Sequence, residues 1–152
     1  MNKKASALIA NNKRALRDFM IFDKYESGIT LKGYEVKSLR NHKVNFKDSY
    51  ARLRNGEIYL HNMNISPYSR ASSIDIDPKR PRKLLLHKKE IKSIEGKLTD
   101  TSLTIIPLSL YFSKNRVKVE LAIAKGKSKR DKRNDMVKKE HDREISRALK
   151  KF

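Results

Sequence analysis

The last 28 residues of the chain are too polar to join an ordinary hydrophobic core, so the upstream sequence must build the fold. Residues 125–152 hold 12 Lys or Arg against 5 Asp or Glu. Their few apolar residues share one helical face that is too narrow for a core helix; they are Val137, Ile145, Ala148, Leu149 and Phe152. This pattern predicts a folded body that carries a long basic arm.

The body is predicted to consist of short β-strands joined by tight turns. The clearest signal is Arg54-Asn55-Gly56-Glu57, because Asn-Gly is the preferred turn of a two-residue hairpin and apolar residues alternate on both sides of it. Further strands are predicted over 19–22, 25–31, 103–112 and 117–123. Helices are predicted over 33–40 and from His87 to a C-terminal cap at Gly96.

Five or six strands with little helix between them predict a mainly β fold, a small antiparallel barrel with two or three short helices. A parallel α/β fold is disfavoured because the chain has too few crossover helices. Gly28 indicates a bulge or a close backbone approach, and Pro107 indicates a bulge or an edge position. The expected interior residues are Ile21, Leu31, Leu53, Ile58, Leu60, Ile105, Leu108, Val119 and Leu121.

The charge balance favours a polyanionic partner. The chain has a formal net charge of +20, and a protein that neutralises phosphates gains free energy from counterion release. Nucleic acid is therefore the favoured partner. A membrane is disfavoured, because no apolar run approaches the roughly 20 residues of a transmembrane helix and no signal peptide follows Met1. The absence of cysteine favours a soluble protein of a reducing compartment, most simply the cytoplasm.

The sequence carries no recognisable catalytic or metal-binding motif. The histidines lack zinc-ligand spacing, and neither a Walker A loop nor a G-x-S-x-G elbow occurs. Asp75 and Asp77 could hold a metal for nuclease chemistry, but a solvated charged loop explains them better. Glu26 has two equally good explanations, a functional acid or an exposed charge at a strand end. Tyrosines that could stack on bases are Tyr50, Tyr59, Tyr68 and Tyr111, although cross-strand packing explains the first two equally well.

Several motifs occur in an order that resembles one protein family. They are Gly33-x-Glu35-Val36-Lys37-Ser38-x-Arg40, Asp48-Ser49-Tyr50, Asp77-Pro78-x-Arg80-x-Arg82-Lys83-Leu84-Leu85-Leu86, Pro107-Leu108-x-Leu110-Tyr111, and Ala124-Lys125-Gly126-Lys127 followed by Asp131-Lys132-Arg133. With them the chain resembles the small protein B family, the SsrA-binding proteins of bacterial trans-translation, from Asn12 to about Arg147. Several motifs in the same order are more specific than any one of them.

The resemblance implies an OB-like RNA-binding barrel at residues 12–124 and a basic C-terminal tail at 125–152, disordered when free and helical on the ribosome. Asn134 could cap that helix, which we expect to extend to about Leu149. Residues 1–11 are polar and without periodicity, which predicts a flexible N-terminus. The family binds the tRNA-like domain of transfer-messenger RNA and accompanies it to stalled ribosomes. We therefore expect a monomeric adaptor without catalysis, cofactor or metal.

The resemblance also assigns candidate site residues by position. The RNA-binding positions are Asn12, Lys13, Arg14, Glu26, Lys83, Leu84 and Leu85. In the family, the start of the tail enters the empty mRNA channel, which small-subunit rRNA lines; the matching positions are Lys125, Gly126, Lys127, Arg130, Asp131, Lys132 and Arg133. The chain departs from the family pattern at Ser102 (usually Gly), Ser128 (often Lys) and Arg130 (often Tyr or His). Tyr or His there is thought to stack on rRNA, and an arginine guanidinium can also stack.

Two other classes of protein remain compatible with the sequence. A structural ribosomal protein with an extended basic arm would be a permanent component of every ribosome, which an adaptor is not. A ribonuclease that used Asp75, Asp77 or Glu26 would cleave RNA in a metal-dependent manner, and replacing those acids would abolish the cleavage.

Overall fold

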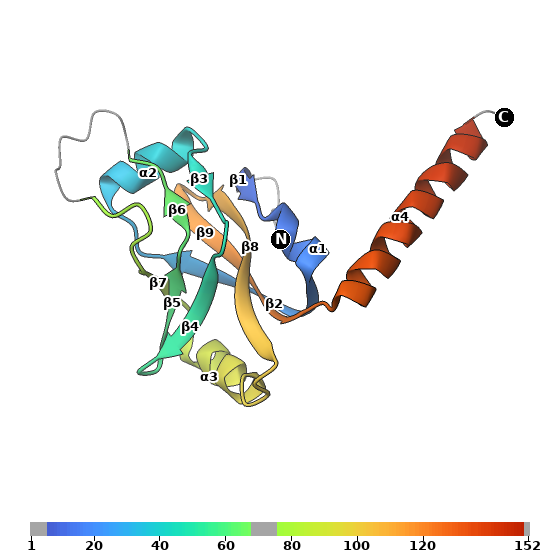
Figure 1. The fold of residues 1–152 in the computed structure, drawn as a ribbon. Helices are drawn as coiled ribbons and strands as arrows, with labels where there is room; N and C mark the ends of the chain where they lie inside the picture. The colour runs from blue at the N-terminus through green and yellow to red at the C-terminus, as the bar shows by residue number, and fades with distance from the viewer. Residues whose placement is uncertain (1–5, 68–75, 151–152) are drawn as a thin grey trace.

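The computed structural model describes residues 6–67 and 76–150, and Figure 1 shows a strand-rich body from which one long helix projects. The elements in these ranges are β1 (Ser6–Asn11), α1 (Lys13–Asp18), β2 (Phe19–Ile29), α2 (Gly33–Arg40), β3 (Val44–Asn45), β4 (Tyr50–Arg54), β5 (Glu57–His61), β6 (Asn64–Ile65), β7 (Arg82–Leu85), α3 (Lys88–Lys97), β8 (Leu103–Ser113), β9 (Arg116–Gly126) and α4 (Lys129–Lys150). Among these ranges, no helix is both long and apolar enough to span a membrane.

The large sheet is antiparallel throughout, and its strand pairings form a circuit that begins and ends at β8. β8 pairs with β9, β9 with β2, β2 with β7, β7 with β5, and β5 with β4. β4 then meets β8 again through the single pair Ala51 and Ile105. β1 adds to the other part of β8, and β3 and β6 form a separate two-stranded sheet. The mainly β prediction is confirmed.

Local sequence signals placed several elements correctly. Asn55 (φ 51°) and Gly56 (φ 75°) both adopt the left-handed conformation that a type I′ turn requires, so the predicted hairpin is confirmed. Helix α2 has the predicted bounds. Helix α3 begins after His87 as predicted, but the cap at Gly96 was wrong, because Gly96 lies within the helix and Leu98 is its C-cap. Burial of Ile91 and Ile94 on the same helix offsets the poor helix propensity of glycine.

Two β-bulges decide which apolar residues enter the main core. The predicted interior residues Ile58, Leu60, Ile105, Val119 and Leu121 belong to it, and Leu31 and Leu53 pack against its edge. Ile21 and Leu108 were assigned wrongly, since both lie in a second cluster with Ala15 of α1. The ladder register shifts between Ile21 and Asp23 and between Pro107 and Ser109, and each shift moves the neighbouring side chains to the opposite face of the sheet.

The assignment of residues 1–11 to a flexible N-terminus was wrong for the part that the structure describes. Ser6–Asn11 form β1, which pairs with β8 from Ser113 to Ser109. Ile9 is 5% exposed and joins the main core. Because the partner strand lies about a hundred residues away in sequence, local periodicity gave no sign of it.

The tail forms one continuous helix, and it begins earlier than Asn134. Helix α4 starts at Lys129 because Ser128 and Asp131 form a capping box: the Asp131 amide donates to Ser128 Oγ (3.1 Å), and the Ser128 amide donates to the Asp131 carboxylate (3.3 Å). None of its residues is buried, and Figure 1 shows it pointing away from the body. That the tail orders only on the ribosome stays a prediction.

Candidate nucleic-acid interface

Three of the predicted RNA-binding residues share the outer face of the sheet, on β2 and β7. Gly28 of β2 is paired with Leu85 on one side and with Lys118 of β9 on the other, so these residues form one row across the sheet. Because side chains alternate between the faces of a strand, Glu26 and Lys83 lie on the same face, two positions from Gly28 and Leu85. The fold therefore places Glu26, Lys83 and Leu85 on one face of the sheet, with Glu26 and Lys83 on opposite sides of the Gly28–Leu85 pair.

Leu84 is a correction to the predicted leucine pair. Leu84 is 0% exposed and belongs to the main core, whereas Leu85 is 54% exposed. Consecutive strand residues face opposite sides of a sheet, so only one of the two leucines can meet a ligand. Gly28 makes room for that leucine, since a Cβ at Gly28 would lie 3.2 Å from Leu85 Cβ. This is the close backbone approach that the sequence predicted.

Leu85 and Lys83 border an open groove of about 630 Å³, which we call the outer-face groove. Its lining includes the apolar residues Ile29, Leu31 and Val36, and also Glu57, Leu86, His87, Asn115, Arg116, Val117 and Lys118. Arg116 and Lys118 were not among the predicted site residues, although the alternation of β9 placed Lys118 on a solvent-facing side. A lining that combines apolar side chains with three cations can hold a base or sugar and its phosphate.

Glu26 lies in an unusual electrostatic position for a basic protein. It accepts a hydrogen bond from the Tyr111 hydroxyl, and it lies directly opposite Glu120 across the β2–β9 ladder. Burial, together with this bond, raises the pKa of the Tyr111 phenol, so Tyr111 stays a neutral donor. Lys24 lies 3.6 Å from Glu120 and offsets part of the repulsion between the two carboxylates. Glu26 is thus an exposed hydrogen-bond acceptor held in place by a tyrosine.

The motif residues Glu35, Arg80 and Arg82 form an ion-pair network at the start of β7. Arg82 is 1% exposed; its Nε donates to Glu35 Oε2 at 2.6 Å, and its terminal nitrogens donate to the carbonyls of Met63 (2.7 Å) and Pro78 (2.9 Å). Arg80 forms an ion pair with the other oxygen of Glu35. Arg82 directly precedes Lys83, so this network fixes the start of β7.

The network also lowers the pKa of the Glu35 carboxyl group. Burial alone would raise the pKa of its carboxyl group. The hydrogen bonds from Arg80 and the Lys32 amide and the charge of Arg82 outweigh burial and leave the pKa below its usual value. Glu35 therefore stays ionised within the folded body.

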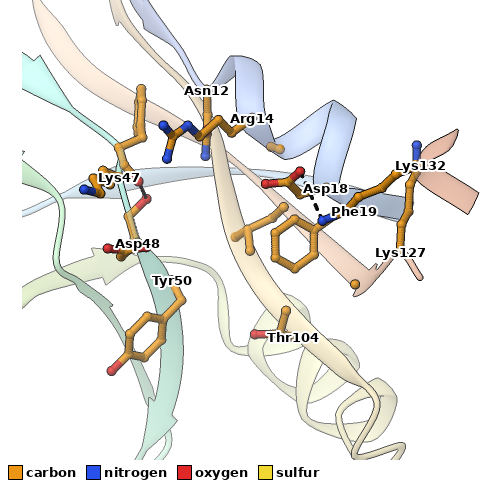
Figure 2. Close-up of a pocket in the computed structure, with 15 residues that line it drawn as sticks. Asn12, Arg14, Asp18, Phe19, Lys47, Asp48, Tyr50, Thr104, Lys127 and Lys132 are labelled. Carbon is orange, nitrogen blue, oxygen red and sulfur yellow. Dashed lines mark hydrogen bonds and ion pairs between the residues drawn. The ribbon is translucent and has the colours of Figure 1, made fainter. Parts of the chain in front are cut away.

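Asn12, Lys13 and Arg14 lie in a different place, where β1 turns into α1. The Asn12 side chain donates to the carbonyl of Pro107 at 2.8 Å, which ties the start of α1 to the bulge in β8. Lys13 and Arg14 are exposed. Asn12 and Arg14 line a second pocket, of about 510 Å³, whose wall also includes Lys47 and Tyr50 (Figure 2). We call it the α1 pocket; the predicted RNA-binding residues thus occupy two separate surfaces.

The predicted tail residues divide into two groups. Lys125, Gly126, Arg130 and Arg133 are exposed. Lys127 instead turns toward the body, with a side chain that is 13% exposed, and Lys132 reaches Asp18 (Figure 2). Asp131 caps α4, and the hydrogen bonds from Ser128 lower the pKa of its carboxyl group. The basic run from Lys125 to Arg133 is therefore not a uniform cationic surface.

The other candidate residues from the sequence take part in packing or in a turn, or lie outside the described residues. Tyr50 stacks on His61 with ring centroids 5.3 Å apart, so cross-strand packing accounts for it. Asp77 stabilises a turn by accepting from the Lys79 amide at 2.9 Å, whereas Tyr68 and Asp75 lie outside the described residues. Within 6–67 and 76–150, no three His, Cys, Asp or Glu side chains cluster closely enough to hold a metal ion.

Comparison with known proteins identifies the family. A sequence model described as SmpB protein matches residues 9–151. The SsrA-binding protein of Carboxydothermus hydrogenoformans is 52% identical over 143 residues, which cover 94% of this chain and 96% of the relative. The SsrA-binding protein of Enterococcus hirae is 47% identical over 152 residues, or 100% of this chain and 99% of the relative.

A solved structure described as "tmRNA-SmpB: a journey to the center of the bacterial ribosome" contains a similar chain. It is 48% identical in sequence, the match covers 81% of this chain and 87% of that one, and the TM-score is 0.69. Sequence and fold thus agree over most of the molecule. This chain belongs to the SmpB protein family.

Proposed function

We propose that the protein binds the tRNA-like domain of transfer-messenger RNA (tmRNA) and brings it to stalled ribosomes for trans-translation. The observation that carries this proposal is the near full-length similarity to SsrA-binding proteins and to the chain of the tmRNA-SmpB structure. The protein would be a monomeric RNA-binding adaptor with no catalysis of its own, acting in the cytoplasm where ribosomes translate.

The body at 12–124 would be an OB-like barrel. Support comes from the circuit of antiparallel pairs that leads from β8 through β9, β2, β7, β5 and β4 back to β8. Helix α3 lies at the end of the body away from α2 (Figure 1). A closed sheet has few free edges and offers a rigid surface of fixed curvature, which suits recognition of a folded RNA by shape.

The outer-face groove would hold the tmRNA. Leu85 would pack on an unstacked base or a sugar, while Lys83, Arg116 and Lys118 would contact phosphates at the rim. Glu26 would accept a hydrogen bond from a base amino group or a ribose hydroxyl, because a carboxylate cannot approach phosphate favourably. Lys13 and Arg14 would add phosphate contacts on the second surface.

The tail at 125–152 would act on the ribosome, in the mRNA channel that is empty when a message has been cut short. Lys125, Arg130 and Arg133 are exposed and can pair with rRNA phosphates, and the Arg130 guanidinium can stack on a base. The like-charge pairs Lys139–Arg143 and Arg143–Arg147 favour fraying of the distal half of the helix in the free protein. That half would order on rRNA.

Truncation after Ser128 tests this division of labour. The truncation keeps β9 and Lys127, so the body should fold. We expect its affinity for tmRNA to stay within about tenfold of the full chain at physiological salt, because specific contacts lie on the body. Peptide tagging on ribosomes stalled at the end of a cut mRNA should be lost. Collapse of tmRNA affinity in a folded truncated protein would contradict the proposal.

A further inference from the structure

We infer that Tyr59 is a stacking platform for an unpaired nucleotide of the bound RNA, on the solvent-facing side of β4, β5 and β7. The inference adds a neighbouring surface to the outer-face groove, and it rests on the proposed function only in taking tmRNA as the RNA. Tyr59 is the middle residue of β5. From the sequence, base stacking and cross-strand packing explained this tyrosine equally well.

The strand register places the Tyr59 side chain on the outer face of the sheet, between two cations. Its neighbours Ile58 and Leu60 are both 0% exposed and belong to the main core, so Tyr59, which alternates with them, faces solvent. Tyr59 is paired with Arg52 of β4 on one side and with Lys83 of β7 on the other. Since adjacent strands lie about 4.8 Å apart, the backbones of Arg52 and Lys83 are about 10 Å apart, with the tyrosine between them.

The Tyr59 side chain lacks the partners that other tyrosines of the sheet have. Tyr50 stacks on His61, and the Tyr111 hydroxyl donates to Glu26. In the part of the chain that the structure describes, no ring stacks on Tyr59, no cation lies over its face, and its hydroxyl makes no hydrogen bond. The structure therefore gives this partly exposed ring no internal role beyond contact with its neighbours along the sheet.

The surroundings of Tyr59 match an unpaired nucleotide. Arg52 is exposed and forms no ion pair with any residue that the structure describes, so its charge is available to a phosphate. Lys83 borders the outer-face groove, which makes the platform continuous with that groove. An aromatic ring between cations binds single-stranded nucleic acid, because a base stacks on the ring while the cations contact the backbone. Bases inside a duplex are covered by their neighbours, so the nucleotide on Tyr59 would be unpaired.

Substitutions that separate stacking from packing test the platform by filter binding to tmRNA. Tyr59→Phe should bind within about twofold of the parent, because stacking uses the face of the ring and not the hydroxyl. Tyr59→Val keeps a high strand propensity, so its melting temperature should stay near that of the parent. Without the ring it should bind about tenfold more weakly. Tyr34→Ala is the matched control and should bind like the parent, because Tyr34 is a partly exposed tyrosine of α2 that does not line the groove.

A tryptophan at the platform reports stacking directly. The chain has no tryptophan, so Tyr59→Trp introduces a single fluorophore whose emission a stacked base quenches. Bound tmRNA should quench this emission, and a short oligouridine strand should do so at low salt, because every base has a face that can stack. A blunt RNA duplex should not, since its bases already stack on one another. Phe22→Trp, at an exposed aromatic position near the start of β2, is the control and should keep its emission with oligouridine.

Three results would overturn the inference: normal tmRNA affinity of Tyr59→Val, unchanged emission of Tyr59→Trp when tmRNA is bound, or equal quenching by the duplex and by oligouridine. Failure of the parent protein to bind tmRNA would instead refute the proposed function. The oligouridine measurement would still decide in that case whether Tyr59 is a platform for unpaired RNA.

Discussion

Both the body and the tail of this protein are rich in arginine and lysine, yet they use these residues in opposite ways. In the body, Arg82 is 1% exposed and its charge is matched by Glu35 and by backbone carbonyls. In the tail, α4 has no buried residue, and most of its cations face solvent. The comparison teaches that the residues behind a net charge of +20 do not form one continuous binding surface. Position in the fold decides whether a cation supports the structure or meets a polyanion.

The largest expected effect follows from breaking the buried ion pair in the body. Glu35→Gln keeps the side-chain shape but leaves Arg82 buried without a counter-ion. Removing one partner of a buried pair costs about 3–5 kcal/mol of unfolding free energy. Urea denaturation should show this loss. Glu57→Gln is the matched control, because its partner Lys83 is 3.7 Å away and both side chains are about 40% exposed; it should change stability by less than about 0.5 kcal/mol.

The pH dependence of stability sharpens this prediction. Glu35 has a folded-state pKa below its unfolded value, so its contribution is present above the unfolded pKa and is lost as the pH falls through the folded pKa. The parent protein should therefore lose stability on acidification more steeply than Glu35→Gln does. Equal acid sensitivity in the two proteins, or a cost of Glu35→Gln as small as that of the control, would show that the pair does not hold the body together.

The next prediction compares the buried Leu84 with the exposed Leu85 on the two faces of β7. Leu84→Ala removes a core side chain and should cost about 2–5 kcal/mol of stability. Leu85→Ala removes an exposed side chain, so it should change stability by less than about 0.5 kcal/mol but weaken tmRNA binding about tenfold, because its apolar contact with a base or sugar is lost. Thermal melting and filter binding measure the two properties. If Leu85→Ala bound tmRNA normally, the outer-face groove would not be the RNA site.

The smallest effect lies in the tail. Ser128→Ala removes the N-cap of α4 and should cost that helix about 1 kcal/mol, seen as reduced helical circular dichroism with an unchanged melting temperature of the body. Ser146→Ala, in the same helix but away from its start, should raise or maintain helicity, because alanine is the better helix former. An equal effect of both changes would mean that the capping box does not determine where α4 begins.

The sequence predicted the parts of the fold that depend on neighbouring residues. The Asn55-Gly56 turn, helix α2 and the alternation of β9 follow from backbone preferences and local spacing. The capping box at Ser128 and Asp131 was also visible as a Ser-x-x-Asp pattern. It was missed because the basic run was treated as an extended arm. Of the candidate site, the resemblance named Lys83 and Leu85, which border one groove, and alternation could have separated Leu85 from Leu84.

The sequence by itself determined the three long strands β2, β8 and β9, the tight hairpin, the basic tail and the family. Only the tertiary structure decided that Ser6–Asn11 become a strand, that two bulges turn Ile21 and Leu108 to the outer face, and that Arg82 is buried while Arg116 borders the groove. The physical reason is that these outcomes depend on partners far away in the chain. Hydrogen-bond ladders, ion pairs and burial form only when the fold brings distant segments together, so local pattern cannot specify them.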